Sequence, residues 1–235
     1  MKAKPRLLDL FCCEGGAAKG YQDAGWDVEG VDFVARFRKR YPGRFILDDA
    51  LDFAAAQWRH YDAIHASPPC HLYSITNASR QYSYPDLVAP TRHTLQAIGK
   101  PYVIENVAGA PLIDPVTLCG SMFGLTATDT DGHPLRMERH RLFESNVSLV
   151  VPGPCDHDKS VDVAGAYQGA RARRGRTAAE HRYDAKHVRH GGYVPPKDVQ
   201  EDLMGIDWMT LYGLAQSLPP VYTQWVGLQL RKAVA

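Results

Sequence analysis

The sequence has few of the features that mark secreted, membrane-spanning or fibrous proteins. Its five cysteines are an odd number scattered along 235 residues, which is poor material for a disulfide framework and favours a reduced, cytoplasmic protein. No apolar run approaches the ~18–20 residues that cross a bilayer, and we expect neither a signal peptide nor a membrane partner. Lys and Arg number 27 against 26 Asp and Glu, so the net charge of +1 neither demands nor excludes a polyanionic partner.

Internal repeats and low-complexity tracts are also missing, apart from one segment rich in Arg, Gly and His. The composition, 45% hydrophobic and 23% charged, is that of an ordinary globular protein. A chain of 235 residues is long for one domain but fits an α/β domain with a small addition. We therefore expect one main core with an appended region.

Short apolar runs alternate with helix-like stretches over the first hundred residues. This alternation predicts a parallel sheet covered by helices on both faces, and ligands of such sheets bind at the carboxyl ends of the strands. The expected strands are 7–11, 28–32, 45–47, 63–66 and 101–104, and the expected helices are 17–24, 35–41, 51–58 and 91–98.

The pattern changes in the second half of the chain, where apolar periodicity disappears between 153 and 196. Residues 171–192 hold seven Arg or Lys against two acids, a basic segment that the net charge conceals. Periodicity then returns, and Pro219 and Pro220 open a last helix, since proline is well tolerated in a first turn. These changes divide the chain into 1–149, 150–204 and 205–235.

Two acids and a glycine-rich turn lie where an adenosine-containing cofactor would bind. Asp9 lies in the first expected strand, and Gly15 and Gly16 in the following turn let the backbone approach a ligand before a helix begins. Asp32 ends the next strand, where Rossmann-like sites meet a ribose hydroxyl. A Gly-Gly turn can also be structural punctuation, and the absence of G-x-G-x-x-G argues against a nicotinamide or flavin cofactor.

Two further strand ends carry residues suited to catalysis. Pro68 and Pro69 precede Cys70, and their fixed φ angles hold the thiol at the rim of the sheet as a candidate nucleophile. Glu105 follows another strand, where a carboxyl can donate a proton or anchor a ligand. Separately, the cysteine could be a small buried residue and the acid a loop cap. Their common placement at strand ends favours function.

With these motifs in place, the sequence resembles the DNA cytosine-5 methyltransferases, which use S-adenosylmethionine. The motifs fall in the family's order and span nearly the whole chain, and the compact size is most similar to bacteriophage-borne members, which act in the cytoplasm of a bacterial host. The segments that carry the resemblance are 9–16, 68–70, 105–107, 139–143, 190–193, 204–209 and 215–223.

The resemblance implies a Rossmann-like S-adenosylmethionine-dependent methyltransferase fold, with a mostly parallel sheet, helices on both faces and a small irregular target-recognition region. Residues 1–149 would be the catalytic and cofactor-binding domain, and the helices of 205–235 would return to it. Only about 55 residues, 150–204, would form the basic target-recognition region. This short region predicts a short or relaxed recognition sequence.

The resemblance also implies a covalent mechanism that needs no metal. Cys70, as a thiolate, would add to carbon 6 of cytosine, and Glu105 would hold the ring through N3 and the exocyclic amine. Arg141, accompanied by Arg139, would contact the base O2 or support the cysteine loop. Carbon 5 would then take the methyl group, and Cys70 would leave by β-elimination after loss of the proton.

Similarity places the cofactor, S-adenosyl-L-methionine, against the first motifs. Phe11 would lie against the adenine, Asp32 would bind the ribose and Asp49 would lie near the adenine amine, while the turn backbone surrounds the methionine portion. The implied cofactor-binding residues are Asp9, Phe11, Glu14, Gly15, Gly16, Asp32, Asp49 and Pro68.

The implied partner is double-stranded DNA. Because a thiol cannot reach a stacked base, the target cytosine would be flipped out, at a cost of a few kcal/mol. The basic segment 171–192 would contact phosphates and read bases, although it could also be a solvated loop. We expect a monomer, since flipping one base needs one active site.

The chain departs from the family pattern at positions that the covalent mechanism does not require. Cys13 stands where the first glycine of the opening motif is usual, and Asp32 is shorter than the usual glutamate. His71 replaces a common glutamine after the cysteine, and Gly213 stands where compact members often carry an acid.

Other functions stay open. The same fold could act on RNA or transfer a modified group from an altered cofactor, and a non-catalytic DNA-binding relative is an alternative from another class. The presence of Cys70 and Glu105 favours catalysis.

Metal binding is a further alternative, but the spacing does not support it. Cys155, His157, His181, His187 and His190 could be imagined as zinc ligands, yet they match no common zinc finger or ribbon. We therefore expect no metal, and interpret the histidines as part of a basic nucleic-acid-binding surface.

Overall fold

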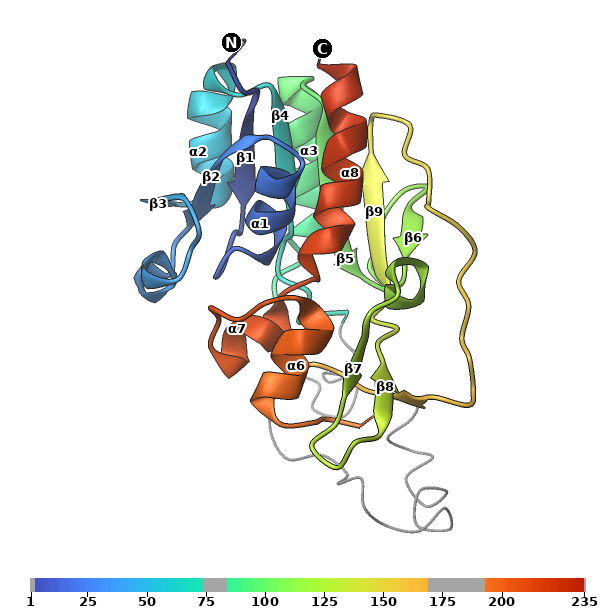
Figure 1. Ribbon diagram of the computed structural model, residues 1–235. Coiled ribbons are helices and arrows are strands. Elements are labelled where there is room, and N and C mark those ends of the chain that lie inside the picture. The colour runs from blue at the N-terminus through green and yellow to red at the C-terminus, as the bar shows by residue number, and fades with distance from the viewer. Residues whose placement is uncertain (1–2, 74–83, 169–192, 235) are drawn as a thin grey trace.

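The computed structural model describes residues 3–73, 84–168 and 193–234, and its centre is a seven-stranded sheet of order β3-β2-β1-β4-β5-β9-β6 (Figure 1). The first five of these strands in spatial order are parallel, β9 runs antiparallel to β5, and β6 runs antiparallel to β9. The strands are β1 (Arg6–Leu10), β2 (Asp27–Asp32), β3 (Arg44–Leu47), β4 (Ala63–Ala66), β5 (Tyr102–Val107), β6 (Val116–Leu118) and β9 (Arg141–Ser145).

The helices follow the strands in the order that the sequence predicts, with one difference. The stretch expected as a helix at 35–41 is a short 3-10 turn over Ala35–Lys39. Within the described ranges, no helix combines the length and hydropathy needed to cross a bilayer. The helices are α1 (Gly16–Asp23), α2 (Ala50–Gln57), α3 (Val88–Ile98), α6 (Lys197–Met204), α7 (Leu211–Gln216) and α8 (Pro220–Ala233), with 3-10 turns η1 (Ala35–Lys39), η2 (Trp58–His60) and η3 (Gly120–Phe123).

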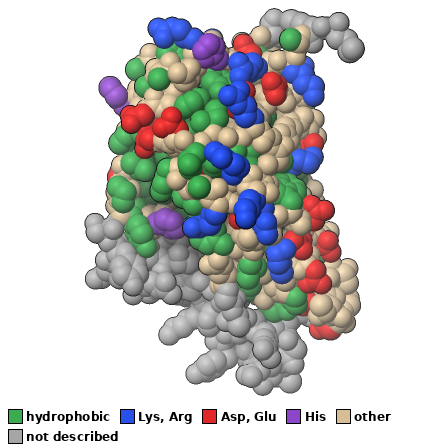
Figure 2. Space-filling view, turned by 90° about the vertical axis from the view of Figure 1, so that its left-hand side faces the viewer, with side chains coloured by type: hydrophobic (Ala, Val, Ile, Leu, Met, Phe, Trp, Pro, Cys, Tyr) green, Lys and Arg blue, Asp and Glu red, His purple; other side chains and the backbone are tan. Residues whose placement is uncertain are grey.

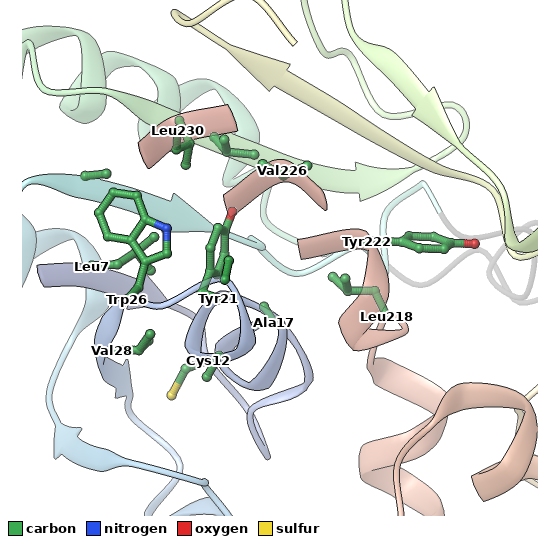
Figure 3. Close-up of a cluster of buried hydrophobic side chains, with 14 of the residues drawn as sticks. Leu7, Cys12, Ala17, Tyr21, Trp26, Val28, Leu218, Tyr222, Val226 and Leu230 are labelled. Carbon is green, nitrogen blue, oxygen red and sulfur yellow. The ribbon is translucent and has the colours of Figure 1, made fainter. Parts of the chain in front are cut away.

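The sheet is covered on both faces because its strands bury alternate side chains on opposite sides. Leu7 belongs to the core shared with α1 and α8, whereas Leu8 belongs to the core shared with α2 and α3. Figure 3 shows the first core, in which Trp26 and Tyr21 lie between the strands and α8. The Trp26 indole donates to the Gly227 carbonyl at 3.0 Å, which fixes the last helix beside the first. The predicted doubly covered, mostly parallel α/β fold is confirmed.

A third hydrophobic cluster lies beyond the carboxyl ends of the main strands, where Figure 1 shows α6 and α7 beside the small sheet. It joins residues on both sides of position 150, such as Leu135 and Leu203, which are fully buried in it. The small sheet has the order β10-β8-β7, with β7 (Thr126–Thr128), β8 (Pro134–Arg136) and β10 (Asp162–Val163). The whole predicted basic segment 171–192, with its three histidines, lies outside the described residues.

Candidate active site

The carboxyl ends of four strands lie in one row. Leu10 pairs with Val31 on one side and with Ala66 on the other, and Ala66 pairs with Ile104. Neighbouring strands lie ~4.8 Å apart, so the row extends over ~14 Å, enough for an elongated ligand and a second reactant side by side. The residues that follow these strand positions are Asp32, Phe11, Ser67 and Glu105.

The turn after β1 is tightly wound and closely surrounded. Phe11 and Cys13 adopt positive φ angles of 58° and 48°, and Gly15 has a φ of 87°. Cys13 therefore tolerates the left-handed backbone at the position where the family usually has glycine. A Cβ on Gly16 would lie 1.8 Å from the Ser217 hydroxyl, so glycine is required for the close approach of the C-terminal segment.

Glu14 ties this turn to the C-terminal part of the chain. Its two carboxylate oxygens accept hydrogen bonds from the Thr210 amide and hydroxyl, each at 2.7 Å, and its carbonyl accepts one from the Trp208 indole. A Cβ on Gly213 would lie 2.3 Å from the Glu14 carboxylate. The absence of an acid at position 213 thus leaves the space that the Glu14 carboxylate fills.

Asp9 lies behind the turn, almost fully enclosed. Its Oδ2 accepts a hydrogen bond from the Tyr41 hydroxyl at 3.2 Å, and its buried Oδ1 has no hydrogen-bond partner. Burial raises the pKa of this carboxyl to about 8, so it holds its proton at neutral pH. Its predicted role in cofactor binding stays a prediction, because the contact that it makes is with the protein itself.

Asp32 lies at the end of β2 with each carboxylate oxygen turned to one backbone amide. Oδ2 accepts from Cys13 at 3.1 Å and Oδ1 from Val34 at 2.9 Å. Burial raises its pKa, and these amides and the Arg36 charge oppose that effect. The Phe33 amide also hydrogen-bonds this carboxylate. Since the two oxygens together offer about four acceptor sites, capacity remains for a ribose hydroxyl.

Asp49 lies at the surface at the start of α2, whereas Phe11 packs partly against the core. Asp49 is exposed, and its Oδ1 caps α2 by accepting from the Leu51 and Asp52 amides at 2.9 and 3.0 Å. Phe11 is half-buried and packs against the hydrophobic core that α2 and α3 share with the sheet. Cofactor contacts by either residue stay predictions.

Two exposed apolar side chains beside Asp32 were not among the residues that the sequence singled out. Phe33 is 70% exposed, and Leu47 is 47% exposed at the end of the neighbouring strand, where it pairs with Asp32. Large exposed hydrophobic side chains next to a buried carboxylate suit the flat face and the hydroxyls of a nucleoside. The signal that could have found Phe33 is an aromatic residue directly after a strand-end acid.

Cys70 lies at the end of a loop that the neighbouring strand holds in place. The Asn106 side chain donates to the Pro68 carbonyl at 2.9 Å, which fixes the proline pair before the thiol. Cys70 is half-buried, and burial raises the pKa of its thiol, while the positive charges of Arg141 and Arg139 oppose that rise. Asn106 belongs to the segment 105–107 that carries part of the family resemblance, but no sequence pattern predicted its contact with Pro68.

Glu105 lies beside Cys70 and is paired with Arg141. The Arg141 Nε is 3.2 Å from Glu105 Oε1, and the Ser67 side chain also hydrogen-bonds this carboxyl. Glu105 is 6% exposed, and burial raises its pKa in spite of the arginine. The structure therefore brings the predicted thiol, carboxyl and guanidinium to one edge, close enough for each charge to affect the thiol.

A buried chain of polar side chains extends from this carboxyl beneath the sheet edge. His65 Nε2 lies 2.8 Å from the Ser67 hydroxyl, and His65 Nδ1 lies 3.0 Å from the Tyr21 hydroxyl. Burial lowers the pKa of His65 to about 3, so the ring stays neutral at ordinary pH. This chain fixes the Ser67 hydroxyl that contacts Glu105, and no sequence motif indicated it.

Arg139 has a different place from Arg141. With a φ of 34°, it directs its guanidinium to backbone carbonyls of the C-terminal segment and of the chain before the undescribed range. The acceptors are the carbonyls of Ala166, Leu214, Ala215 and Ser217.

Basic side chains gather beyond the β2 and β3 end of the row of strand ends. Figure 2 shows Lys and Arg side chains over the face that carries β3. Exposed members of this group on η1, directly after it and on β3 are Arg36, Arg38, Lys39, Arg40 and Arg44.

Comparisons with known proteins give structural likeness without sequence likeness. No protein-family model and no curated protein matches the chain. A protein described as a DNA modification methyltransferase encoded within a prophage of E. coli shares 13% identity at a TM-score of 0.60, over 97% of this chain and 99% of that one. The Dnmt2 methyltransferase of S. pombe shares 11% identity at a TM-score of 0.61, over 98% and 99% of the two chains. The Entamoeba histolytica methyltransferase EhMeth shares 11% identity at a TM-score of 0.54, over the full length of both.

The likeness covers the whole of this chain, including the C-terminal helices that return to the main sheet. At such low identities it bears on the arrangement of the backbone. The predicted Rossmann-like methyltransferase fold is confirmed, and the chain has the fold of the methyltransferases to which it is similar.

Proposed function

We propose that the protein transfers a methyl group from S-adenosylmethionine to carbon 5 of cytosine in DNA, through a covalent bond to Cys70. The observation that carries this proposal is the grouping of a half-buried thiol with the Glu105–Arg141 pair, in the same row of strand ends as Asp32. The DNA-modifying description of the prophage protein of similar fold and the basic segment 171–192 both favour DNA as substrate.

The cofactor would bind at the β1 and β2 end of the row. Asp32 has acceptor capacity for ribose hydroxyls, and Phe33 offers an exposed face for the adenine. The donor and acceptor chemistry of these residues therefore fits S-adenosylmethionine. When bound, the cofactor supplies a methyl group on a positively charged sulfonium.

Glu105 would bind and activate the cytosine. Burial raises its pKa. In its protonated form it would donate a hydrogen bond to N3, while its second oxygen would accept one from the exocyclic amine. Arg141, which contacts the same carboxyl, lies beside the base O2 in this arrangement. These contacts strengthen as negative charge develops in the ring, which lowers the barrier to addition.

Cys70 would supply the electron pair. Its thiol proton would pass to solvent as the Sγ–C6 bond forms. The C5–C6 π electrons would then bond carbon 5 to the methyl carbon, while the bond from that carbon to the sulfonium sulfur breaks and the demethylated thioether leaves. The C5 proton then leaves to solvent, its electron pair restores the double bond, and the Sγ–C6 bond breaks. Arg141 and Arg139 oppose the burial-induced rise in the thiol pKa. Arg139, held by C-terminal carbonyls, is a positioning residue in this scheme.

A trapping experiment tests the proposal. The protein is incubated with S-adenosylmethionine and duplex DNA containing 5-fluorocytosine, whose fluorine cannot leave as a proton does, so the covalent adduct should persist under denaturing electrophoresis. Cys70→Ser, which removes the nucleophile, should give no adduct, while omission of the cofactor should prevent the stable product.

A fluorinated RNA of the same sequence runs beside the DNA. Adduct formation on RNA alone would replace DNA by RNA as substrate. Absence of any adduct, with binding of the same DNA retained, would support the non-catalytic alternative. Thermal melting of Cys70→Ser checks that loss of the adduct reflects the thiol and not unfolding.

A further inference from the structure

Four sulfur and imidazole ligands lie together outside the active site. One ligand atom from each residue lies within 4.8 Å of the corresponding atoms of all the others. The cluster, called here the Cys2His2 cluster, consists of Cys119, His140, Cys155 and His157.

The sheet brings the first two ligands together. Leu118 of β6 pairs with Arg141 of antiparallel β9, so Cys119 after one strand faces His140 before the other. The remaining two ligands, Cys155 and His157, are separated by one residue in the loop that follows β9. Because strand pairing brings Cys119 and His140 together, the sequence did not predict the Cys2His2 cluster. The two residues are separated by 20 others, and no known metal-site spacing connects them.

The distances fit ligands around one ion. His140 Nε2 lies 3.3 Å from Cys155 Sγ, and His157 Nε2 lies 3.4 Å from Cys119 Sγ and 2.7 Å from Cys155 Sγ. Tetrahedral Zn²⁺ with bonds of ~2.3 Å to sulfur and ~2.0 Å to nitrogen separates its ligand atoms by about 3.3–3.8 Å. Only the last of the three contacts must lengthen to reach that range.

Neighbouring polar side chains contact the ligands of the cluster, as polar side chains behind the ligands do in protein metal sites. The Ser121 hydroxyl points to both sulfurs, at 3.3 Å from Cys119 and 3.7 Å from Cys155. His157 turns Nε2 to the sulfurs and Nδ1 toward Glu138, whose Oε1 is 3.6 Å away. A carboxylate behind a ligating histidine fixes the ring and increases its basicity, as is usual in zinc sites.

We propose that Cys119, His140, Cys155 and His157 bind one structural Zn²⁺. Two thiolates and two imidazoles form a complete tetrahedral set for zinc and a poor one for Mg²⁺ or Ca²⁺, which prefer oxygen ligands. Both thiols lose their protons to solvent when they bind the ion. All four positions are occupied by protein, so the ion holds structure and does not activate water.

The site would fix the segment that carries the active-site arginines. His140 lies between Arg139, which binds C-terminal carbonyls, and Arg141, which pairs with Glu105. Zinc would fasten this segment to η3 and to the loop of Cys155, which is otherwise exposed. The proposal replaces the expectation of no metal, and it does not depend on the proposed methyl transfer.

The test uses protein without a histidine tag, purified under reducing conditions and analysed by elemental mass spectrometry. We expect one zinc per chain in the unsubstituted protein and none in Cys155→Ser or His140→Ala. His133→Ala, which removes an exposed histidine, and Cys70→Ser, which removes the active-site thiol, should each keep one zinc. The Cys70 variant separates metal binding from catalysis, because it loses methyl transfer only.

Cobalt substitution keeps the test decisive if a ligand variant fails to fold. Co²⁺ in the unsubstituted protein should show the visible bands of a tetrahedral site and thiolate-to-cobalt charge transfer. Zinc that remains in both ligand variants overturns the proposal, as does a zinc-free protein without these bands after reconstitution. A Cys119–Cys155 disulfide in freshly reduced, metal-supplied protein would also overturn it.

Discussion

Two buried glutamates on neighbouring antiparallel strands differ in how many hydrogen bonds their carboxylate oxygens accept. Glu144 on β9 binds Arg92 through both oxygens, at 2.7 and 2.6 Å, and also accepts the Ile113 amide at 2.8 Å. Glu105 on β5 has Arg141 at 3.2 Å and the Ser67 side chain. Their exposures are nearly equal, at 4% and 6%, so burial alone does not distinguish them.

The difference separates a structural ion pair from a site prepared for a ligand. The Arg92 guanidinium forms a forked pair with Glu144, which raises the pKa of the arginine and stabilises both charges. Glu105 has one longer contact with its arginine besides the Ser67 hydrogen bond, and burial prevails over both in raising its pKa. A carboxyl with spare hydrogen-bonding capacity and a raised pKa can serve a base that arrives later.

The largest expected effect is on catalysis by Glu105→Gln. The amide keeps the shape of the carboxyl but cannot pair with Arg141 as an anion or pass a proton to N3. We expect kcat/KM for methyl transfer to fall on the order of 10²–10³-fold, as when one charge-stabilising donor is lost. Initial rates with tritiated cofactor measure this, and a loss below threefold would remove Glu105 from the mechanism.

Glu144→Gln should lower the stability of the protein and leave its activity nearly unchanged. It breaks the forked pair and leaves Arg92 buried without its counter-charge, so the free energy of unfolding should fall by about 3 kcal/mol. Methyl-transfer rates at a temperature where the variant stays folded should remain within about threefold. Urea unfolding followed by fluorescence gives the first quantity. If this variant loses activity as strongly as Glu105→Gln, the contrast between the two glutamates is wrong.

Asp9 provides a third buried carboxyl, which lacks an arginine in its described contacts. Its pKa is raised from 3.8 to about 8, so the folded protein binds a proton more tightly than the unfolded chain does. Stability from this group is therefore complete below pH 4 and is lost as the pH rises toward 8, at up to about 1.4 kcal/mol per pH unit.

Asp9→Asn should remove that contribution to the pH dependence. The free energy of unfolding of the variant should fall less steeply between pH 4 and pH 8 than that of the unsubstituted protein. Urea unfolding at intervals of one pH unit gives both slopes. Asp23→Asn, at an exposed residue paired with Lys19, is the control and should leave the slope unchanged. Equal slopes for Asp9→Asn and the unsubstituted protein would contradict the raised pKa.

Sequence reasoning located the strands of the parallel half closely, because each is a short apolar run between polar turns. The expected strand at 63–66 is β4 as observed, and the row of strand ends that it predicted is present. Cys70 could be named for the same reason, since residues after neighbouring parallel strands meet at one edge. Glu105 was expected directly after a strand at 101–104, but β5 continues to Val107, so Glu105 lies within the strand, just beyond its parallel pairing with β4. Their predicted roles still depend on the proposed chemistry.

Contacts between distant segments could not be predicted in this way. Glu14 meets Thr210, and Cys119 meets His140, through packing and strand register that leave no local pattern in the chain. Glu144 shows in a second way that the sequence alone does not reveal the role of a residue. It is the same residue type as Glu105 and equally buried, and only its partners reveal that it is structural.

The smallest expected effect concerns the cofactor end of the row, where Phe33 is the exposed aromatic neighbour of Asp32. If its ring stacks on the adenine, Phe33→Ala should weaken S-adenosylmethionine binding by 0.5–1.5 kcal/mol, or about 2–10-fold in Kd. Isothermal titration calorimetry measures this directly, with Leu228→Ala as a control at an exposed apolar residue of α8. Because Phe33 is distant from Glu105 along the row, kcat at saturating cofactor should not change. An unchanged Kd would place the adenine elsewhere, whereas a reduced kcat with unchanged Kd would connect Phe33 to the base-binding end instead.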